Sequence, residues 1–142
     1  MIYTEKTKKA MKLCFQAHKD QVDKSGLPYV FHPFHLAEQM KTEETTVVAL
    51  LHDVVEDTQV TLDQLTEMGF GREVVEAVAL MTHEKGVDYM DYVAAIKDNP
   101  IAKAVKLADL AHNSDLTRID VVDEKAIQRR EKYLKAIDFL NQ

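Results

Sequence analysis

The chain has few of the residues that interrupt helices or cross-link a fold. Its 142 residues include four glycines, three prolines, one cysteine and no tryptophan. The single cysteine, Cys14, excludes an internal disulfide, and its apolar neighbours indicate an inert place in the core. No apolar run approaches the roughly 18 residues of a membrane-spanning helix, and the N-terminus lacks the apolar stretch of a signal peptide. We therefore expect a cytoplasmic protein that does not enter a membrane.

Basic residues are fewer than acidic ones. The chain has 18 lysines and arginines against 24 acidic residues, a net charge of −6. Proteins that bind nucleic acid polymers or anionic membranes normally present a basic face, so the composition argues against both partners. A small anionic substrate is compatible with it, because a metal and a few local cations outweigh the global charge at one site. The sequence identifies no exposed apolar patch, which leaves the oligomeric state open.

Helical periodicity runs through nearly the whole chain, and no segment alternates like a half-buried strand over a useful length. The length predicts one domain, residues 1–142. We expect an all-α, compact bundle of about seven or eight helices. The expected helices cover approximately residues 4–20, 33–40, 45–55, 61–68, 73–81, 89–97, 100–116 and 126–140.

The most chemically dense segment is His52-Asp53-Val54-Val55-Glu56-Asp57, directly after an apolar run. Four ionisable groups at the end of a buried helix are costly unless something compensates them, and a divalent metal is the simplest compensation. His52 and Asp53 can supply a nitrogen and an oxygen ligand to the same ion. On a continuous helix Glu56 and Asp57 lie at i,i+4 from these two residues, so all four would share one face.

Two further residues complete a candidate ligand set. His32 lies on the loop entering a short helix, and Asp109 lies in an apolar stretch where an unpaired carboxylate would be expensive. With His52 and Asp53 they give a mixed nitrogen and oxygen set that suits Mn²⁺, Fe²⁺, Zn²⁺ or Mg²⁺. Each residue alone has an ordinary structural explanation, but the ordered set is far more specific. Open coordination positions would make the site catalytic, able to lower the pKa of a bound water and polarise a phosphoryl oxygen.

This set resembles the H…HD…D metal signature of the HD-domain phosphohydrolases. Five segments extend the match and together are similar to the hydrolase domain of the RelA/SpoT alarmone family: residues 17–21, 25–33, 51–58, 105–109 and 112–113. The motifs cover most of the chain, which is similar in size to the free-standing small alarmone hydrolases and too short for synthetase and regulatory domains. The resemblance implies an all-α fold, Mn²⁺ as the metal, and removal of the 3′-pyrophosphate from (p)ppGpp, a small phosphorylated nucleotide.

The resemblance also implies roles for individual residues. Glu56 and Asp57 would position or deprotonate the attacking water as general base. Asn113, at i+4 from Asp109, would face the same pocket and contact the substrate. Further candidates for contacts with phosphate or ribose oxygens are Lys24, Ser25 and Lys106.

Three positions depart from the alarmone-hydrolase pattern, which usually carries basic residues there. They are Asp23, Leu110 and Asp115. The metal chemistry is intact, but the positive charge available for a highly charged nucleotide is reduced. The reaction type is therefore better determined than the substrate. Arg118 and Lys103 are candidate substitutes for the missing charge.

The remaining polar residues have supporting interpretations. His18 and Gln21 continue the apolar face of the first helix, where they would hydrogen-bond to neighbours of the ligands rather than bind metal. We interpret the other histidines as structural and one arginine pair as part of a solvated face: His35, His83, His112 and Arg129-Arg130.

Four hypotheses are compatible with these residues. We favour a metal-dependent alarmone-type pyrophosphohydrolase over an HD phosphohydrolase acting on another nucleotide or phosphorylated metabolite. A degenerate HD domain that binds nucleotide or a protein partner is disfavoured, because all ligands and acids are present. A helical bundle with a structural metal leaves Glu56 and Asp57 without a role.

Overall fold

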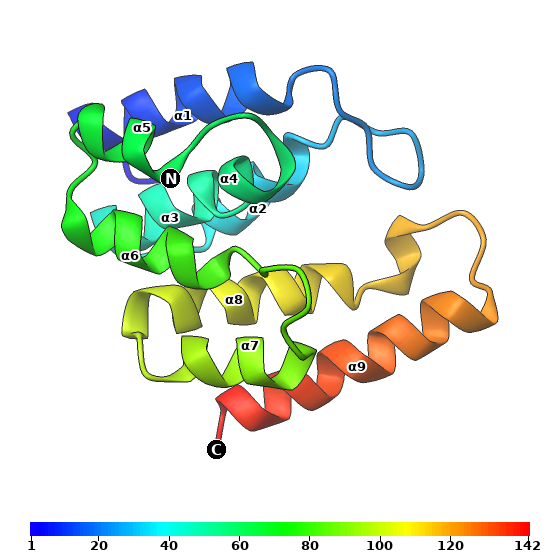
Figure 1. Cartoon of the computed structure of the whole chain (residues 1–142). Coiled ribbons are helices and arrows are strands. Elements are labelled where there is room, and N and C mark those ends of the chain that lie inside the picture. Colours follow the sequence, from blue (N-terminus) through cyan, green and yellow to red (C-terminus); the bar gives the residue numbers. More distant parts are fainter.

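Every regular element of the chain is helical in a computed structural model that describes all 142 residues (Figure 1). The elements are α1 (Glu5–His18), α2 (Phe31–Glu38), α3 (Glu43–Leu51), α4 (Val54–Asp57), α5 (Leu62–Glu67), α6 (Arg72–Met81), α7 (Tyr89–Lys97), α8 (Pro100–Asn113), a 3₁₀ turn η1 (Leu116–Arg118) and α9 (Glu124–Leu140). The only β-type pairing is one isolated bridge, between Val22 and Pro28. The all-α prediction is confirmed.

Short polar side chains begin most of these helices, as local sequence preference predicts. Thr4 accepts a hydrogen bond from the backbone N–H of Thr7, and Thr61 accepts one from that of Gln64. In both cases the third residue of the helix returns a bond to the cap, which satisfies two N–H groups that the helix itself cannot pair. Pro100 occupies the first position of α8, where its missing N–H costs nothing.

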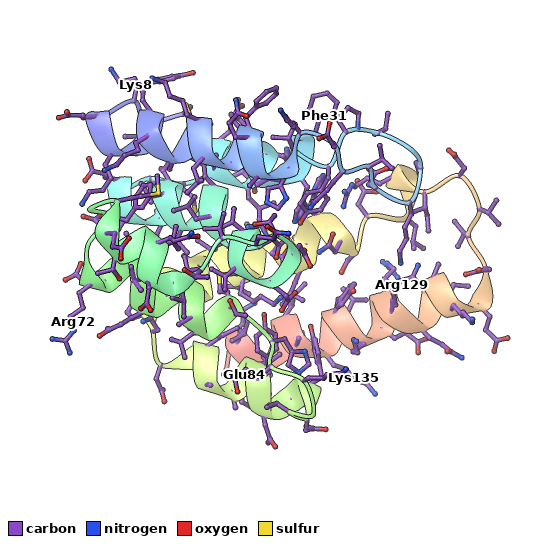
Figure 2. The ribbon with its side chains drawn as sticks, turned by 45° about the horizontal axis from the view of Figure 1, so that its top comes forward. Lys8, Phe31, Arg72, Glu84, Arg129 and Lys135 are labelled. Carbon is purple, nitrogen blue, oxygen red and sulfur yellow. The ribbon has the colours of Figure 1, made fainter.

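The core is organised around α3, whose residues 46–51 are all fully buried. This helix packs against α1, α2, α6 and α8. The apolar run therefore has partners on every side, and each fully buried leucine or valine side chain contributes roughly 1.5–3 kcal/mol. In Figure 1, α9 runs along the side of α8 that faces away from α3. Figure 2 shows the side chains of Lys8 and Arg72 pointing away from the ribbon. The central position of α3 places whatever follows Leu51 in the interior.

The helix expected over residues 45–55 is interrupted, which corrects the prediction. α3 ends at Leu51, His52 and Asp53 form a turn, and α4 begins at Val54. Nδ1 of His52 donates a hydrogen bond to the carbonyl oxygen of Ala49 at 2.7 Å. In a continuous helix that oxygen would accept from the backbone N–H four residues later, so the side chain competes with the helix for it. The i,i+4 relation between His52 and Glu56 on one continuous helix is therefore wrong. The split also explains why there is one helix more than expected.

The end of α8 and the burial of Cys14 can also be compared with the sequence prediction. The helix predicted to reach residue 116 ends at Asn113, where the backbone N–H of Ser114 donates to carbonyl oxygens of the last helical turn, and η1 follows. Cys14 is fully buried, as predicted, and burial raises the pKa of its thiol to about 12. None of the helices has both the length and the apolar character needed to cross a membrane.

Candidate active site

Three helices bring the predicted ligands together. His32 lies in the first turn of α2, His52 directly follows α3, and Asp109 lies on α8. Because α2 and α8 both pack against α3, these side chains meet in the interior. One ligand atom from each lies within 4.8 Å of the others, and all three residues are buried. This group could bind a divalent metal.

Asp53 joins this group to a second one. Its Oδ2 atom lies 3.1 Å from Nε2 of His52 and also accepts a hydrogen bond from the hydroxyl of Tyr29. Oxygens of Asp53, Glu56 and Asp57 lie within 4.8 Å of one another on the other side. Burial raises the pKa of Asp53 well above its usual value, and the charge of nearby Asp109 raises it further. The four predicted ligands and the two predicted acids therefore form one continuous cluster.

The hydrogen bonding of His52 tests whether the cluster fits a cation. Its Nδ1 atom donates to the carbonyl oxygen of Ala49, so in the neutral imidazole Nε2 is the nitrogen that carries the lone pair. That buried Nε2 has no hydrogen-bond partner, yet it faces Oδ2 of Asp53 at 3.1 Å and Oδ1 of Asp109 at 3.6 Å. Acceptor atoms that converge in a buried place repel one another unless a cation lies between them. The residues present fit a divalent metal.

His32 contacts a histidine that the sequence pattern had indicated as merely structural. Its Nε2 atom lies 2.9 Å from Oδ1 of Asp109, and its Nδ1 atom lies 2.7 Å from Nδ1 of His112. The two imidazole planes differ by only 4°, as expected for an in-plane hydrogen bond. Burial and the nearby guanidinium of Arg118 lower the pKa of His112 to about 4, so its ring is neutral and can accept. His112 is at i+3 from Asp109, which was the available signal in the sequence.

Lys106 is buried and neutralises Asp109. Its Nζ atom donates to Oδ2 of Asp109 at 2.9 Å, and Asn113 donates to Oδ1 at 3.0 Å. Burial alone would lower the pKa of Lys106, but the charge of Asp109 outweighs it and raises that pKa. Burial likewise opposes ionisation of Asp109, but Lys106 holds the pKa of that carboxyl well below its usual range. Asp109 is thus an ionised carboxylate in the interior.

The two acids of α4 are exposed beside this buried cluster. Oε1 of Glu56 accepts a hydrogen bond from the backbone N–H of His83 at 2.6 Å, which ties α4 to the segment after α6. Gln21 donates to the carbonyl oxygen of Asp57 at 3.1 Å, and Nδ1 of His18 lies 2.7 Å from Oε1 of Gln21. His18 and Gln21 therefore support α4 through its backbone. Solvent can reach the acid side chains.

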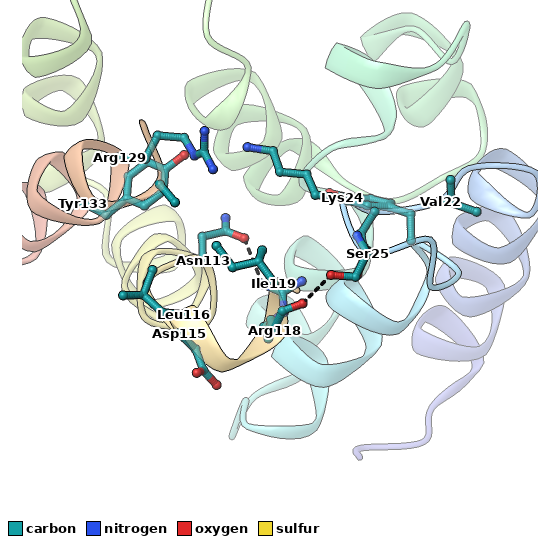
Figure 3. A pocket seen from close by; sticks show the side chains of 13 residues that line it. Val22, Lys24, Ser25, Asn113, Asp115, Leu116, Arg118, Ile119, Arg129 and Tyr133 are labelled. Carbon is teal, nitrogen blue, oxygen red and sulfur yellow. Dashed lines mark hydrogen bonds between the residues drawn. The ribbon is translucent and has the colours of Figure 1, made fainter. Parts of the chain in front are cut away.

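A cavity of about 430 Å³ adjoins the cluster (Figure 3). Tyr29 and Asn113 line it and also hydrogen-bond to Asp53 and Asp109, so the cavity opens next to the candidate ligands. Ser25 lines it as well, with its hydroxyl bonded to the carbonyl oxygen of Arg118 at 2.7 Å. Of the four predicted substrate contacts, Lys24, Ser25 and Asn113 line the cavity, whereas Lys106 is not among its lining residues and bonds to Asp109 instead.

Three cations reach this cavity, namely Lys24, Arg118 and Arg129. None of them belongs to any of the five ion pairs of the structure. Figure 3 shows Lys24 and Arg129 extending toward each other from opposite walls. Partial burial and the charge of Arg129 lower the pKa of Lys24. Of the arginine pair interpreted as part of a solvated face, Arg130 is exposed, whereas Arg129 is half-buried and lines this cavity.

The three departures from the alarmone-hydrolase pattern each have a structural role. Oδ1 of Asp23 accepts the N–H groups of Ser25 at 2.9 Å and Leu27 at 3.0 Å, which closes a loop. Oδ1 of Asp115 caps η1 through the N–H and hydroxyl of Thr117, at 3.0 and 2.6 Å. Leu110 is buried in the core. Of the candidate substitutes, Arg118 lines the cavity.

The sequence matches the family model described as "HD domain" over residues 10–110. The chain belongs to the HD-domain family. A mouse protein named guanosine-3′,5′-bis(diphosphate) 3′-pyrophosphohydrolase MESH1 is 38% identical over 120 residues, which cover 73% of this chain and 66% of that protein. A protein of Aquifex aeolicus with the same enzyme name is 30% identical over 145 residues, which cover 94% of this chain and 20% of that protein.

The HD fold is confirmed by a solved structure of a protein described as a metazoan ortholog of SpoT that hydrolyses ppGpp. The TM-score is 0.81 at 24% identity, with 99% of this chain and 88% of the other covered. Among longer relatives, which include proteins named as GTP pyrophosphokinases, the HD-domain chain spans about a fifth of the length or less.

Proposed function

We propose that this HD-domain protein is a metal-dependent phosphohydrolase that removes the 3′-pyrophosphate from (p)ppGpp or a closely related nucleotide. The observation that carries the proposal is the convergence of Nε2 of His52, which has no hydrogen-bond partner, with carboxylate oxygens of Asp53 and Asp109. The names of the mouse and Aquifex aeolicus relatives support the choice of substrate.

In this proposal His32, His52, Asp53 and Asp109 hold the metal. Two imidazole nitrogens and two carboxylates form a borderline donor set, and Mn²⁺ is the ion we assign to it. When bound, a divalent ion lowers the pKa of a coordinated water and stabilises charge on a phosphoryl oxygen. Lys106 keeps Asp109 ionised and oriented, which makes its contribution indirect.

Glu56 and Asp57 position the attacking water and accept its proton as general base. Their carboxylates are exposed and lie within 4.8 Å of the ligand Asp53, so a water beside the metal ligands is within their reach. The hydrogen bond from His83 fixes one oxygen of Glu56 and leaves the other free to accept a proton. Glu56 is the better oriented of the two acids.

The cavity binds the nucleotide. Lys24, Arg118 and Arg129 offer positive charge and form no ion pair within the protein, which suits a polyphosphate. Ser25 and Asn113 add neutral polar groups on the same walls. Asn113 touches both Asp109 and this cavity, so it links the bound nucleotide to the candidate metal site.

One observation favours a second candidate, an HD phosphohydrolase acting on a different phosphorylated nucleotide. Asp23 and Asp115 line the cavity at positions where the alarmone hydrolases usually carry basic residues. Their charges reduce the attraction for a ligand with two diphosphate groups. A nucleotide with less negative charge is the corresponding alternative substrate.

A hydrolysis panel with Mn²⁺ tests the proposal. Purified protein is incubated with ppGpp, ordinary nucleoside diphosphates and triphosphates, and 3′-phosphorylated nucleotides, and the products are separated by anion exchange. We expect GDP and pyrophosphate from ppGpp, and no turnover after metal removal or in Asp53→Ala. Cleavage of another nucleotide with ppGpp untouched would replace the first candidate with the second. No metal-dependent turnover of any compound would reject both.

A further inference from the structure

A pair of hydrogen-bonded histidines lies behind the candidate metal site. Nδ1 of His32 and Nδ1 of His112 are 2.7 Å apart, and the two rings are nearly coplanar. Two ring nitrogens at this distance share one proton, so one of them donates and the other accepts. The direction of this bond decides which nitrogen of His32 carries a lone pair.

His32 has two competing tautomers. If Nδ1 carries the hydrogen and donates to His112, Nε2 points its lone pair toward the candidate metal site. If Nε2 carries the hydrogen, it donates to Oδ1 of Asp109 at 2.9 Å, and a metal loses two ligand atoms at once. Asp109 favours the second arrangement, since a carboxylate is a strong acceptor. Only an acceptor on the Nδ1 side offsets that preference.

We propose that His112 is a positioning residue that holds His32 in the tautomer able to bind the metal. This inference rests on the metal site of the proposed function. His112 is itself held in place, because Arg118 donates to its carbonyl oxygen at 3.0 Å. Partners of this kind commonly change metal affinity 10- to 100-fold.

Four variants separate positioning from general structural support. His112→Ala removes the acceptor, and His112→Leu removes it while filling the space. His112→Asn places an amide oxygen close to the position of Nδ1 and restores an acceptor. His35→Ala is the matched control, since it removes an exposed imidazole that packs on His112 without a hydrogen bond. Thermal melting followed by circular dichroism shows which variants are folded.

The main readout is the Kd for Mn²⁺ measured by titration calorimetry on the full chain. We expect His112→Ala and His112→Leu to raise this Kd about 10- to 100-fold, and His112→Asn and His35→Ala to stay within about threefold of the parent protein. Excess Mn²⁺ should recover most of the kcat of His112→Ala without changing the KM for the nucleotide, because the defect lies in metal retention.

Unchanged Mn²⁺ affinity in a folded His112→Ala or His112→Leu would overturn the positioning role and leave the proposed function standing. Equal weakening in His112→Asn and His112→Leu would also overturn it, because the effect would then not depend on an acceptor. If the parent protein itself does not bind Mn²⁺, the metal site of the proposed function fails, and this inference fails with it. If His112→Ala does not fold, the Mn²⁺ Kd of His112→Asn is compared with that of His112→Leu, and a lower Kd in His112→Asn supports the positioning role.

Discussion

Oδ2 of Asp53 lies 3.1 Å from Nε2 of His52, the ring nitrogen that carries the lone pair when the imidazole is neutral and Nδ1 donates to Ala49. The contact is unfavourable in the protein alone and favourable once a cation lies between the two atoms. Stability without metal and affinity for metal therefore oppose each other at this position. Exchanging one acceptor for a donor should separate the two quantities.

Asp53→Asn is expected to stabilise the metal-free protein while abolishing metal binding. The same oxygen, Oδ2, faces His52 and accepts from Tyr29, so an amide nitrogen in its place can donate one hydrogen to Nε2 of His52 and the other to the hydroxyl oxygen of Tyr29. A repulsion between two acceptors then becomes a hydrogen bond. We expect a gain of about 1 kcal/mol in the free energy of unfolding, measured by urea titration in EDTA. Asp138→Asn, at an exposed site on α9, is the control. A destabilised Asp53→Asn would mean that the contact is not repulsive.

Manganese should raise the melting temperature of the parent protein. At a free concentration of about 100 times its Kd, a ligand that binds only the folded state adds about 2.7 kcal/mol. For a chain of this size that corresponds to an increase of roughly 8 °C, measured by scanning calorimetry. EDTA should reverse the increase, and Asp53→Ala should not show it. A melting temperature indifferent to Mn²⁺ would contradict the assignment of the four ligands.

Glu56→Gln should lose turnover while keeping metal. The amide oxygen of glutamine can still accept from the backbone of His83, so the geometry of α4 is retained and only the base is removed. We expect kcat to fall about 10²- to 10⁴-fold with an unchanged Kd for Mn²⁺. Glu76→Gln, an exposed glutamate paired with Arg72 on α6, is the matched control. Normal turnover in Glu56→Gln would remove Glu56 from the mechanism.

Arg129→Ala should weaken substrate binding rather than chemistry. Its guanidinium reaches the cavity from α9 and makes no ion pair within the protein, so its charge is available to a phosphate. We expect KM to rise about tenfold, the loss of one charge-assisted contact, with kcat changed much less. Lys135→Ala removes an exposed charge from the same helix and should leave KM unchanged. An equal effect of the two substitutions would indicate long-range attraction instead of contact.

Cys14 should resist thiol reagents until the protein unfolds. Its side chain is fully buried, and burial raises the pKa of the thiol from 9.0 to about 12. At about pH 8 a colorimetric disulfide reagent should label the denatured chain completely and the folded chain only at the rate of unfolding. Because the folded pKa is the higher one, stability should be complete below pH 9 and fall as the pH rises toward 12. Rapid labelling of folded protein would contradict the buried placement.

That His32, His52, Asp53 and Asp109 meet in one place could be predicted from sequence, because they are polar residues in or beside apolar surroundings. His52 follows an apolar run, and Asp109 lies within one, so the cost of burying a polar group was enough to single out both residues from the sequence alone. The bounds of α7, residues 89–97, agree with the range expected from helical periodicity in the sequence. The turn at His52 and Asp53 could not be predicted, because it depends on a side chain competing with the backbone for one carbonyl group.

The cavity was harder to predict because its residues come from elements that meet only through helix packing. Arg129 lies on α9, and whether it faces solvent or the loop carrying Lys24 depends on how α9 packs against α8. Tyr29 has no sequence signal for its contact with Asp53, since the two are far apart in the chain. The helical spacing of His112 from Asp109 was a sequence signal, but nothing in the sequence showed that His112 contacts His32.

The structural roles of Asp23, Leu110 and Asp115 restrict how this chain could be re-engineered. Arginine at position 23 or 115 would remove the carboxylate that closes a turn, and at position 110 it would place a charge among core residues. A directed-evolution campaign for tighter nucleotide binding would therefore lose stability at each of these positions before it gained affinity. The accessible starting points are cavity residues with few structural duties, such as the exposed Val22.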